Sequence, residues 1–232
     1  MPPATARARV RAELTSEILD AARRQLAEHG SASLSLRAVA REVGMVSSAV
    51  YRYFPSRDEL LTALIMDAYN SLGETVERAE RRPARREHFE RWMAICRTVR
   101  SWALAHPHEY SLIYGSPVPG YQAPATTIAP ATRVALVLVA LLNDAHSAGT
   151  LADSPPIPSP GKALTRDLDR LQGVFVGVPD GTTVRALVAW ASLYGTVSFE
   201  LFGQFHNVIA AHSQYFDVAM TEMAVFVGLP TT

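Results

Sequence analysis

The sequence predicts an all-α protein, and three features support this fold class. Apolar residues return every three or four positions over most of the chain, as at Leu14, Ile18 and Ala22, and this spacing places them on one face of a helix. The alternation of apolar and polar residues that is typical of half-buried strands is nearly absent. Pro55 and Pro107 stand where periodic stretches stop, and a proline cannot continue a helix. We therefore expect helices joined by turns.

Three of these helices are expected near the N-terminus. The first is long and amphipathic, and Ser35 is the N-cap of a second, short helix. The second helix ends at Gly44, where glycine lets the backbone turn sharply, and a third runs from about Ser47 to the residue before Pro55. Two short helices joined by a turn with Gly form the helix-turn-helix pattern, whose second helix enters the major groove of DNA. The pattern therefore predicts DNA binding.

A fourth helix is expected to follow directly. Ser56 and Glu59 form a capping box, in which side chains satisfy the free backbone N–H groups of the first turn. Apolar residues at helical spacing continue from Leu60 towards Glu80. The basic pair before Pro83 then marks the break between an N-terminal domain and a C-terminal body.

Residues Val43–Leu60 resemble the N-terminal domain of the tetracycline-repressor (TetR/AcrR) family. The block Y-R-Y-F-P-S-R-D-E-L carries most of this resemblance. The family positions are occupied here by Gly44, Tyr51, Phe54, Arg57 and Leu60. The resemblance implies a transcriptional repressor that binds a palindromic double-stranded DNA operator as a homodimer. It also implies that a small apolar effector binds the C-terminal domain and releases the operator.

Seven side chains are expected to contact DNA. Ser47 and Ser48 open the recognition helix, where short polar side chains approach base edges or phosphates, although both could simply cap the helix. The resemblance places Tyr51 and Arg57 at phosphates, and Arg52 is a candidate for guanine readout or a solvated charge. The expected DNA-binding residues are Arg37, Ser47, Ser48, Tyr51, Arg52, Tyr53 and Arg57.

Charge is divided unevenly along the chain, although the net charge is zero. Residues 1–57 hold nine Arg and five acidic residues, which gives this part +4 and the remainder −4. A basic end favours nucleic acid as its partner. The neutral total argues against an architectural DNA-binding protein, which depends on broad phosphate neutralisation. A constitutive DNA-binding protein without an effector stays open as an alternative.

Three regions follow from these patterns. Residues 1–11 are rich in Pro, Ala and Arg and are expected to form a flexible arm. Residues 12–72 are expected to form the helix-turn-helix domain with the start of the connecting helix. Residues 84–229 are expected to form a C-terminal domain for effector binding and dimerisation. In that domain, helices are expected at about 84–106, 126–146, 164–171, 182–205 and 211–227.

The segment Trp190–Gly195 resembles the Trp-His-Gly signature of one class of TetR C-terminal domains, and R-S-W-A-L-A-H-P-H-E-Y resembles an earlier helix of that class. Tyr194 stands where the signature has His, which puts any role of the imidazole in doubt. An effector pocket is expected among the aromatic side chains of this domain, which could also fill its core. The expected ligand-binding residues are Trp102, Tyr110, Tyr114, Trp190 and Tyr194.

A homodimer is expected through the last two helices. Gly195 and Gly203 lie eight residues apart on one expected helix, and small residues at such spacing let two helices approach closely. The same apolar period would also suit the core of a monomer. The expected interface residues are Gly195, Phe199, Gly203 and Met220.

Other functions find little support in the sequence. No His pair has metal-ligand spacing on a helix, and neither a Gly-rich phosphate loop nor a nucleophile elbow occurs, so no enzyme, metal site or cofactor is expected. Cys96 is the only cysteine, which excludes an intrachain disulfide and fits a reducing cytoplasm. The longest apolar run, Val134–Leu142, is short of the roughly 20 residues of a membrane helix. We expect a cytoplasmic protein that associates with the nucleoid when it binds DNA.

Overall fold

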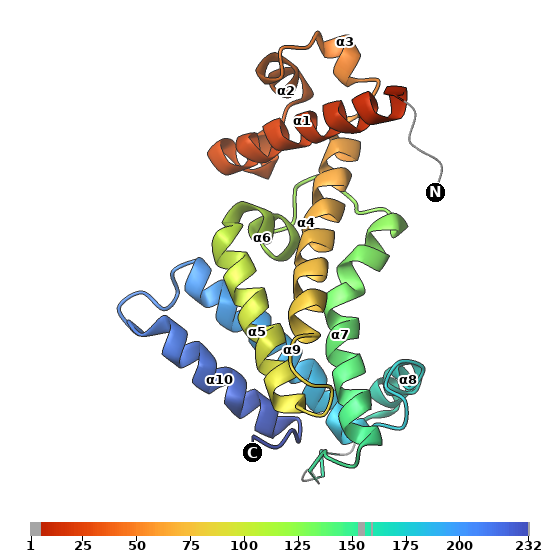
Figure 1. Cartoon of the computed structure of the whole chain (residues 1–232), viewed down its shortest axis with the longest axis vertical. Coiled ribbons are helices and arrows are strands. Elements are labelled where there is room, and N and C mark those ends of the chain that lie inside the picture. The colour runs from red at the N-terminus through yellow and green to blue at the C-terminus, as the bar shows by residue number, and fades with distance from the viewer. Residues whose placement is uncertain (1–5, 153–155, 159, 232) are drawn as a thin grey trace. The chain divides into compact units, whose positions relative to one another are not determined.

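The structure, a computed structural model shown in Figure 1, describes residues 6–152, 156–158 and 160–231. Within these ranges the chain forms α-helices and two short 3-10 turns but no strand, which confirms the all-α prediction. Its contacts divide the chain into two compact units. The first unit comprises Met1–Asn70 and His106–Ala131, and the second comprises Ser71–Ala105 and Thr132–Thr232.

The first unit combines the N-terminal helices with a later segment of the chain. Its core contains Ile18, Val39, Val50 and Leu60, all fully buried. These residues come from four helices packed around one apolar centre, which confirms the expected helix-turn-helix domain. The elements in chain order are α1 (Ala6–His29), the 3-10 turn η1 (Ser31–Ser33), α2 (Leu36–Glu42), α3 (Ser47–Val50), the first part of α4 (Arg57–Glu80), α6 (Pro107–Tyr114) and the 3-10 turn η2 (Ala125–Thr127).

This division differs from the domain boundaries expected at residues 72 and 84. Residues 106–131 belong to the first unit, because hydrogen bonds tie them to the start of α4. The hydroxyls of Thr62 and Tyr121 are hydrogen-bonded at 2.8 Å, and the Tyr69 hydroxyl donates to the carbonyl of Ile113 at 3.2 Å. The chain therefore passes between the units three times rather than once.

The prediction of a flexible arm over residues 1–11 is wrong for residues 6–11, because α1 begins at Ala6. Alanine and arginine have high helix propensity, so this Ala-Arg segment extends the helix. Arg11 adds a contact, since its guanidinium carbon lies 5.1 Å from the centre of the Tyr53 ring. The first half of the expected arm, residues 1–5, lies outside the described residues.

The start of α4 agrees with the capping box seen in the sequence. The hydroxyl of Ser56 accepts a hydrogen bond of 3.1 Å from the backbone N–H of Glu59. The helix is continuous from Arg57 to Glu80. Its first part belongs to the first unit and residues 71–80 belong to the second unit, so the chain enters the second unit inside a helix.

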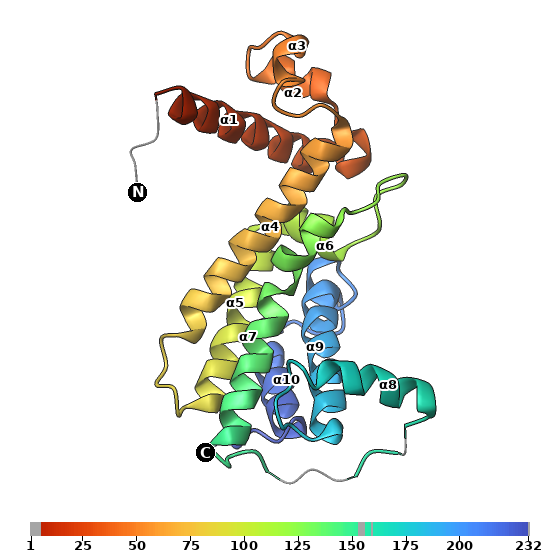
Figure 2. The same cartoon turned by 90° about the vertical axis from the view of Figure 1, so that its right-hand side faces the viewer.

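The second unit is a helical bundle, as the sequence predicts for the C-terminal domain. Within it, α5, α9 and α10 pack against one another (Figures 1 and 2). Trp92 is fully buried in α5, and its indole N–H donates to the carbonyl of Met220 in α10 at 2.8 Å. The helices of this unit, besides the end of α4, are α5 (His88–Ala105), α7 (Ile128–Ser147, from Thr132 onward), α8 (Lys162–Leu171), α9 (Asp180–Leu201) and α10 (His212–Phe226).

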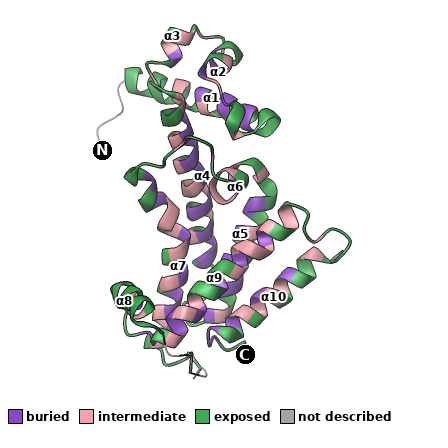
Figure 3. Cartoon of the chain, turned by 180° about the vertical axis from the view of Figure 1, so that it is seen from behind, coloured by how far each residue is buried: buried purple, intermediate pink, exposed green. Residues whose placement is uncertain are grey.

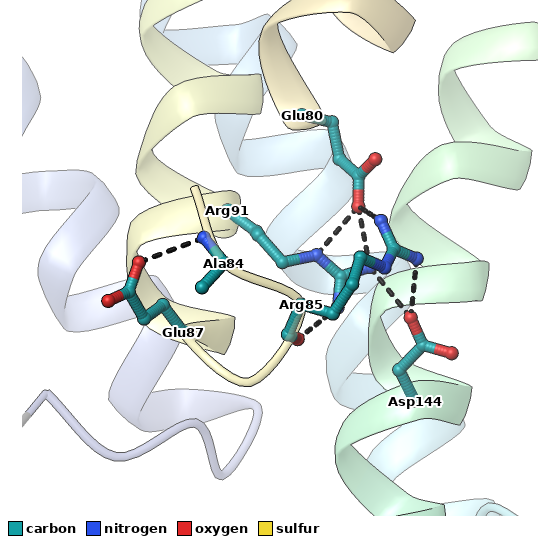
Figure 4. A network of polar contacts seen from close by, with 6 residues as sticks. All are labelled: Glu80, Ala84, Arg85, Glu87, Arg91 and Asp144. Atoms are coloured by element: carbon teal, nitrogen blue, oxygen red, sulfur yellow. Dashed lines mark hydrogen bonds and ion pairs between the residues drawn. The ribbon is translucent and has the colours of Figure 1, made fainter. Parts of the chain in front are cut away.

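A buried ion-pair network joins three helices of the second unit (Figure 4). Arg91 of α5 is fully buried, and its guanidinium donates to Glu80 of α4 at 2.6 Å and to Asp144 of α7 at 2.7 Å. It also donates to the carbonyl of Arg85 at 2.9 Å, and the Arg85 side chain contacts the same two carboxylates. Because loss of one partner would leave a buried charge uncompensated, this network holds α4, α5 and α7 together.

One helical segment, Ala125–Ser147, is long and apolar enough to cross a membrane by length and composition alone. The expectation from the sequence considered only the uninterrupted run Val134–Leu142, and the helix around that run is longer. The core helix of a soluble protein meets the same criterion when it is mostly buried, whereas 28% of the apolar window of this segment is buried. One such segment is weak evidence for a membrane partner.

Candidate functional site

The turn between α2 and α3 depends on one glycine. Gly44 has a φ of 69°, in the left-handed region that favours glycine. Its N–H donates to the carbonyl of Arg41 at 3.3 Å, and the N–H of Met45 donates to the carbonyl of Ala40 at 2.8 Å. These bonds close the last turn of α2 before the chain bends and starts α3. The helix-turn-helix connection is thus confirmed.

α3 is shorter than the sequence predicts. It ends at Val50, and residues 51–53 form a turn before Phe54. Both Val50 and Phe54 are buried and anchor this segment in the core of the first unit. The N–H of Tyr51 donates to the carbonyl of Ser47 at 3.1 Å, and the N–H of Phe54 donates to Val50 at 3.0 Å. Because these bonds keep helical spacing beyond α3, the whole segment presents one outward face.

This outward face, which we call the α3 surface, carries short and polar side chains. Ser48 and Arg52 are exposed, Tyr51 is 42% exposed and Ser47 is half-buried. Val46 occupies the N-cap position, so neither serine is the cap of α3. Within the described part of the chain, neither serine hydroxyl has a hydrogen-bond partner. The α3 surface is therefore open to a partner molecule.

Arg57 has a role inside the first unit that the sequence did not reveal. Its guanidinium donates to the carbonyl of Ser31 at 2.9 Å and lies 3.5 Å from the carboxylate of Asp58. The first contact ties the start of α4 to the turn η1. The phosphate contact expected for Arg57 would have to use the guanidinium N–H groups that are not bonded to Ser31.

The nine arginines of residues 1–57 fall into two groups. Four are held within the first unit: Arg11 on the ring of Tyr53, Arg23 by Asp20 and Asp67, Arg24 by Glu42, and Arg57 by Ser31. Five are exposed and have no partner among the described residues: Arg7, Arg9, Arg37, Arg41 and Arg52. Unpaired positive charge attracts a phosphate backbone, so the first unit offers a candidate DNA-binding surface.

The second unit contains an apolar cavity of about 260 Å³ between α5, α7, α8 and α9. Leu136, Leu138 and Leu142 line it from α7, Phe175 lines it from the segment after α8, and Trp190 lines it from α9. The volume lies just below the range of about 300–1,000 Å³ that is common for small-molecule sites. With these walls, the cavity suits a small molecule without charge.

The five aromatic residues expected at a ligand are divided between the two units, and only Trp190 lines this cavity. Tyr110 and Tyr114 belong to the first unit, where their rings lie 5.1 Å apart. Trp102 is buried in the second unit, and Tyr194 contacts Trp190 with ring centres 6.0 Å apart. Sequence reasoning could not separate these roles, because aromatic side chains fill cores as readily as they line pockets. It also missed the leucines of α7, whose apolar period indicated only a core helix.

Exposed positions occur along α9 and α10 of the second unit (Figure 3), and several of them are apolar residues. Phe199 in α9 is 51% exposed, and Val218 in α10 is 61% exposed. At Gly195 of α9, no atom apart from the adjacent residues and the backbone of the same helix comes within 4 Å of the position that a Cβ would take. Exposed apolar side chains, where they form a contiguous patch, are typical of a protein interface.

Two of the expected interface residues lie elsewhere. Met220 is fully buried on the inner face of α10, so it has no surface to offer to a second chain. Gly203 lies beyond the end of α9 with a φ of 80°, so this glycine serves a left-handed turn and not the close packing of two helices. Val218 and Val225 of α10 are exposed apolar residues that the sequence analysis did not name. They share the helical period of Tyr215, and this signal could have found them.

Comparison with known proteins gives the same two parts. Residues 18–64 match the family described as bacterial regulatory proteins, tetR family. Residues 92–223 match the family described as tetracyclin repressor-like, C-terminal domain. The first match covers the helix-turn-helix segment, and the second runs from α5 into α10.

Curated relatives and solved structures agree with these matches. The HTH-type transcriptional regulator Rv1816 of Mycobacterium tuberculosis is 42% identical over 205 residues, which cover 84% of this chain and 83% of that protein. The HTH-type transcriptional regulator Mb1846 of Mycobacterium bovis is equally similar. The crystal structure of the protein SCO4313 has a TM-score of 0.74 and 34% identity, and the match covers 93% of this chain and 97% of that one. Regulators of this type bind DNA and are not enzymes, which accounts for the exposed α3 surface. These matches show that the chain belongs to the TetR family of bacterial transcriptional regulators.

Proposed function

We propose that this protein is a ligand-responsive transcriptional repressor. It binds a palindromic operator as a homodimer and leaves the operator when a small apolar effector binds. The observation that carries the proposal is the α3 surface, where Ser48, Tyr51 and Arg52 are exposed in a chain of a DNA-binding family. The alternative is a constitutive DNA-binding protein, and the apolar cavity of the second unit favours the effector-controlled version over it.

The proposed roles at the α3 surface follow from side-chain length and exposure. Ser47 and Ser48 approach base edges or phosphates at the start of α3. The hydroxyl of Tyr51 reaches a phosphate oxygen, and Arg52 donates two hydrogen bonds to a guanine. Arg37, which is exposed on α2, holds a phosphate.

Tyr53 and Arg57 have a second task in this proposal, because both are already engaged within the first unit. The ring of Tyr53 carries the guanidinium of Arg11, and Arg57 donates to the carbonyl of Ser31. They would contact phosphates with their remaining polar groups. Their contacts inside the unit would also hold the ends of the α3 segment in place for the other side chains.

The DNA half of the proposal is tested by selection from a random-sequence duplex library with the wild-type protein. A palindromic consensus, bound by two chains, is the expected result, because recognition helices of a dimer read two half-sites. An architectural protein would enrich no sequence. A reporter gene placed behind the selected operator then distinguishes repression from activation.

A dimer interface on α9 and α10 completes the proposed assembly. The support is the exposed apolar side of these helices, including Phe199 and Val218, and the open space beside Gly195. Gly195→Leu fits within the single chain but fills the seam between two chains, and overpacking costs about 1–3 kcal/mol. Light scattering should show a wild-type dimer and a shift of Gly195→Leu towards monomer with unchanged helical circular dichroism. Ala163→Leu on α8 adds a bulky side chain elsewhere and should stay dimeric; a monomeric wild type would contradict the interface.

Effector binding can reach α4 through α7, which lines the cavity. Arg133 of α7 forms two hydrogen bonds with Glu77 of α4, at 2.8 and 2.9 Å. Near its other end, α7 contributes Asp144 to the network of Arg91 and Glu80. A ligand that displaces α7 would therefore also move residues 71–80 of α4. The other end of α4 begins at Arg57, directly after the segment that carries the α3 surface.

The effector half is tested with apolar molecules found by thermal-shift screening. Affinity of such a molecule should fall about 5- to 150-fold in the presence of operator, and operator affinity should fall by the same factor, because coupling is reciprocal. Glu77→Gln should retain ligand binding and reduce this factor. Asp217→Asn is the matched control, since it weakens an ion pair with Arg97 that joins α5 to α10. A cavity ligand that leaves operator affinity unchanged would favour the constitutive alternative.

We assign the C-terminal domain, as part of the same proposal, to the Trp-His-Gly class through Trp190–Gly195. Trp190 lines the cavity and contacts Tyr194, which occupies the position of the His in that signature. In this proposal the protein acts in the cytoplasm and on the nucleoid, without a cofactor, metal or membrane partner.

A further inference from the structure

The first two turns of α1 carry arginines on two opposite sides. A helix turns by about 100° per residue, so Arg7 and Arg11 lie on the same side of α1 as Ile18, whereas Arg9 lies on the opposite side. Ile18 is buried in the core of the first unit. Arg7 and Arg11 therefore extend the inner side of α1 beyond the point where the apolar core ends.

This side of α1 adjoins the α3 surface. Ala6, Arg7, Val10 and Arg11 form an open hollow together with Tyr53, the residue that follows Arg52 in the chain. The guanidinium of Arg11 lies over the ring of Tyr53 at 5.1 Å. Arg7 lies one turn further along α1, exposed and without a partner among the described residues. Two positive charges thus line a hollow next to the proposed recognition segment.

The two sides of α1 also differ in charge. The nearest acidic residue on α1, Glu13, stands four positions after Arg9 and therefore lies on the side of Arg9. Asp20 stands nine positions after Arg11, half a turn around the helix, so it also lies on the side of Arg9. The side of Arg7 and Arg11, which adjoins the α3 surface, therefore carries two positive charges with no acidic residue of α1 one turn away.

We propose that Arg7 and Arg11 form a phosphate clamp that holds the DNA backbone beside the bases contacted by the α3 surface. The clamp rests on the proposed DNA binding and extends its footprint to a second element. Duplex DNA is the partner that fits, because the hollow is open, carries two cations and continues the surface that reads the duplex. The stacking on Tyr53 holds Arg11 in place before DNA arrives, which reduces the ordering cost of the contact.

The clamp is tested by comparing Arg7→Ala with Arg9→Ala on the duplex selected by the wild-type protein. Both variants remove one charge, and both introduce the best helix former, so α1 should stay intact. Each lost phosphate contact lowers the slope of log affinity against log salt by about 0.9, and a dimer loses two. At about 0.15 M salt, this loss corresponds to about a 30-fold weaker complex for Arg7→Ala. Arg9→Ala should lose much less, and Arg7→Lys should retain the wild-type slope, because lysine also binds phosphate as a point charge.

Neutral methylphosphonate groups, placed one at a time along the duplex, locate the contact. Substitution at one position in each half-site should lower the affinity of the wild-type protein for the duplex but leave the affinity of Arg7→Ala unchanged. Equal salt slopes for Arg7→Ala and Arg9→Ala, with wild type still selecting a sequence, would overturn the clamp alone. A wild-type protein that binds no duplex in a salt-dependent way would overturn the proposed DNA binding itself.

Discussion

Two groups of arginines, one in each unit of this protein, are used in opposite ways. In the first unit, Arg37 and Arg52 belong to a group of exposed arginines without partners among the described residues. In the second unit, arginines join helices through carboxylates: Arg91 contacts Glu80 and Asp144, Arg100 contacts Glu200, and Arg133 contacts Glu77. These arginines of the first unit are thus available for an anionic partner, whereas the named arginines of the second unit are satisfied inside the fold.

The surroundings explain the difference. A guanidinium in water loses little when it has no partner, whereas a buried one must be paired and hydrogen-bonded to be tolerated. Arg91 is fully buried and fully engaged, and the hydrogen bond from Arg133 holds the pKa of Glu77 below its ordinary value. Net charge alone would not distinguish these two uses of arginine. The presence or absence of a carboxylate partner for each arginine does distinguish them.

The largest effect should come from breaking a buried arginine contact. Arg91→Ala leaves the buried Glu80 with only the exposed side chain of Arg85 as its ion-pair partner, and breaking a buried ion pair costs about 3–5 kcal/mol. Denaturant unfolding of the full chain should show this decrease. If the variant does not fold, Arg91→Met combined with Glu80→Leu should recover most of the stability, since apolar replacements of a buried pair are often neutral. A loss below about 1 kcal/mol for Arg91→Ala would show that the network does not hold the helices.

An exposed arginine should show the reverse behaviour. Arg52→Ala should leave unfolding within about 0.5 kcal/mol of wild type, because Arg52 has no partner in the first unit. It should cost about 1–3 kcal/mol of discrimination at one base position of the selected operator. Arg41→Ala, an equal change of charge on α2, serves as the control and should not relax any single position. Equal weakening at every position for both variants would remove Arg52 from base readout.

The smallest effect concerns pH and should be specific to the second unit. Burial lowers the pKa of His88, with the nearby charge of Arg91 as the next cause. The unfolded chain therefore takes up this proton first, so the free energy of unfolding should decrease as pH falls below about 6.5, down to the lowered pKa. His88→Gln should flatten this decrease while retaining a partner for the Thr150 hydroxyl, which lies 3.1 Å from Nδ1. Denaturant midpoints at about pH 7.5 and about pH 5.5 measure the difference, and an equal slope in both proteins would assign it to other groups.

The helices and their ends were largely determined by the sequence itself. The capping box of Ser56 and Glu59 gives the start of α4, and the glycine at position 44 gives the turn before α3. These features act within a few residues along the chain, where helical period, caps and turns are decided. The α3 surface could be predicted from the sequence for the same reason. Val50 and Phe54 anchor one side of this short segment in the core, so its other side is exposed.

Only the tertiary structure decided which helix faces are covered and which arginines are free. Arg57 donates to Ser31, and Met220 is buried rather than offered to a partner. Residues 106–131 belong to the first unit, and the cavity is lined by more residues from α7 than from any other helix but by only one of the expected aromatic residues. Each of these outcomes depends on contacts between segments that are far apart in the sequence. Helical period gives the apolar side of a helix, but the neighbour that covers it is set by the packing of the whole unit.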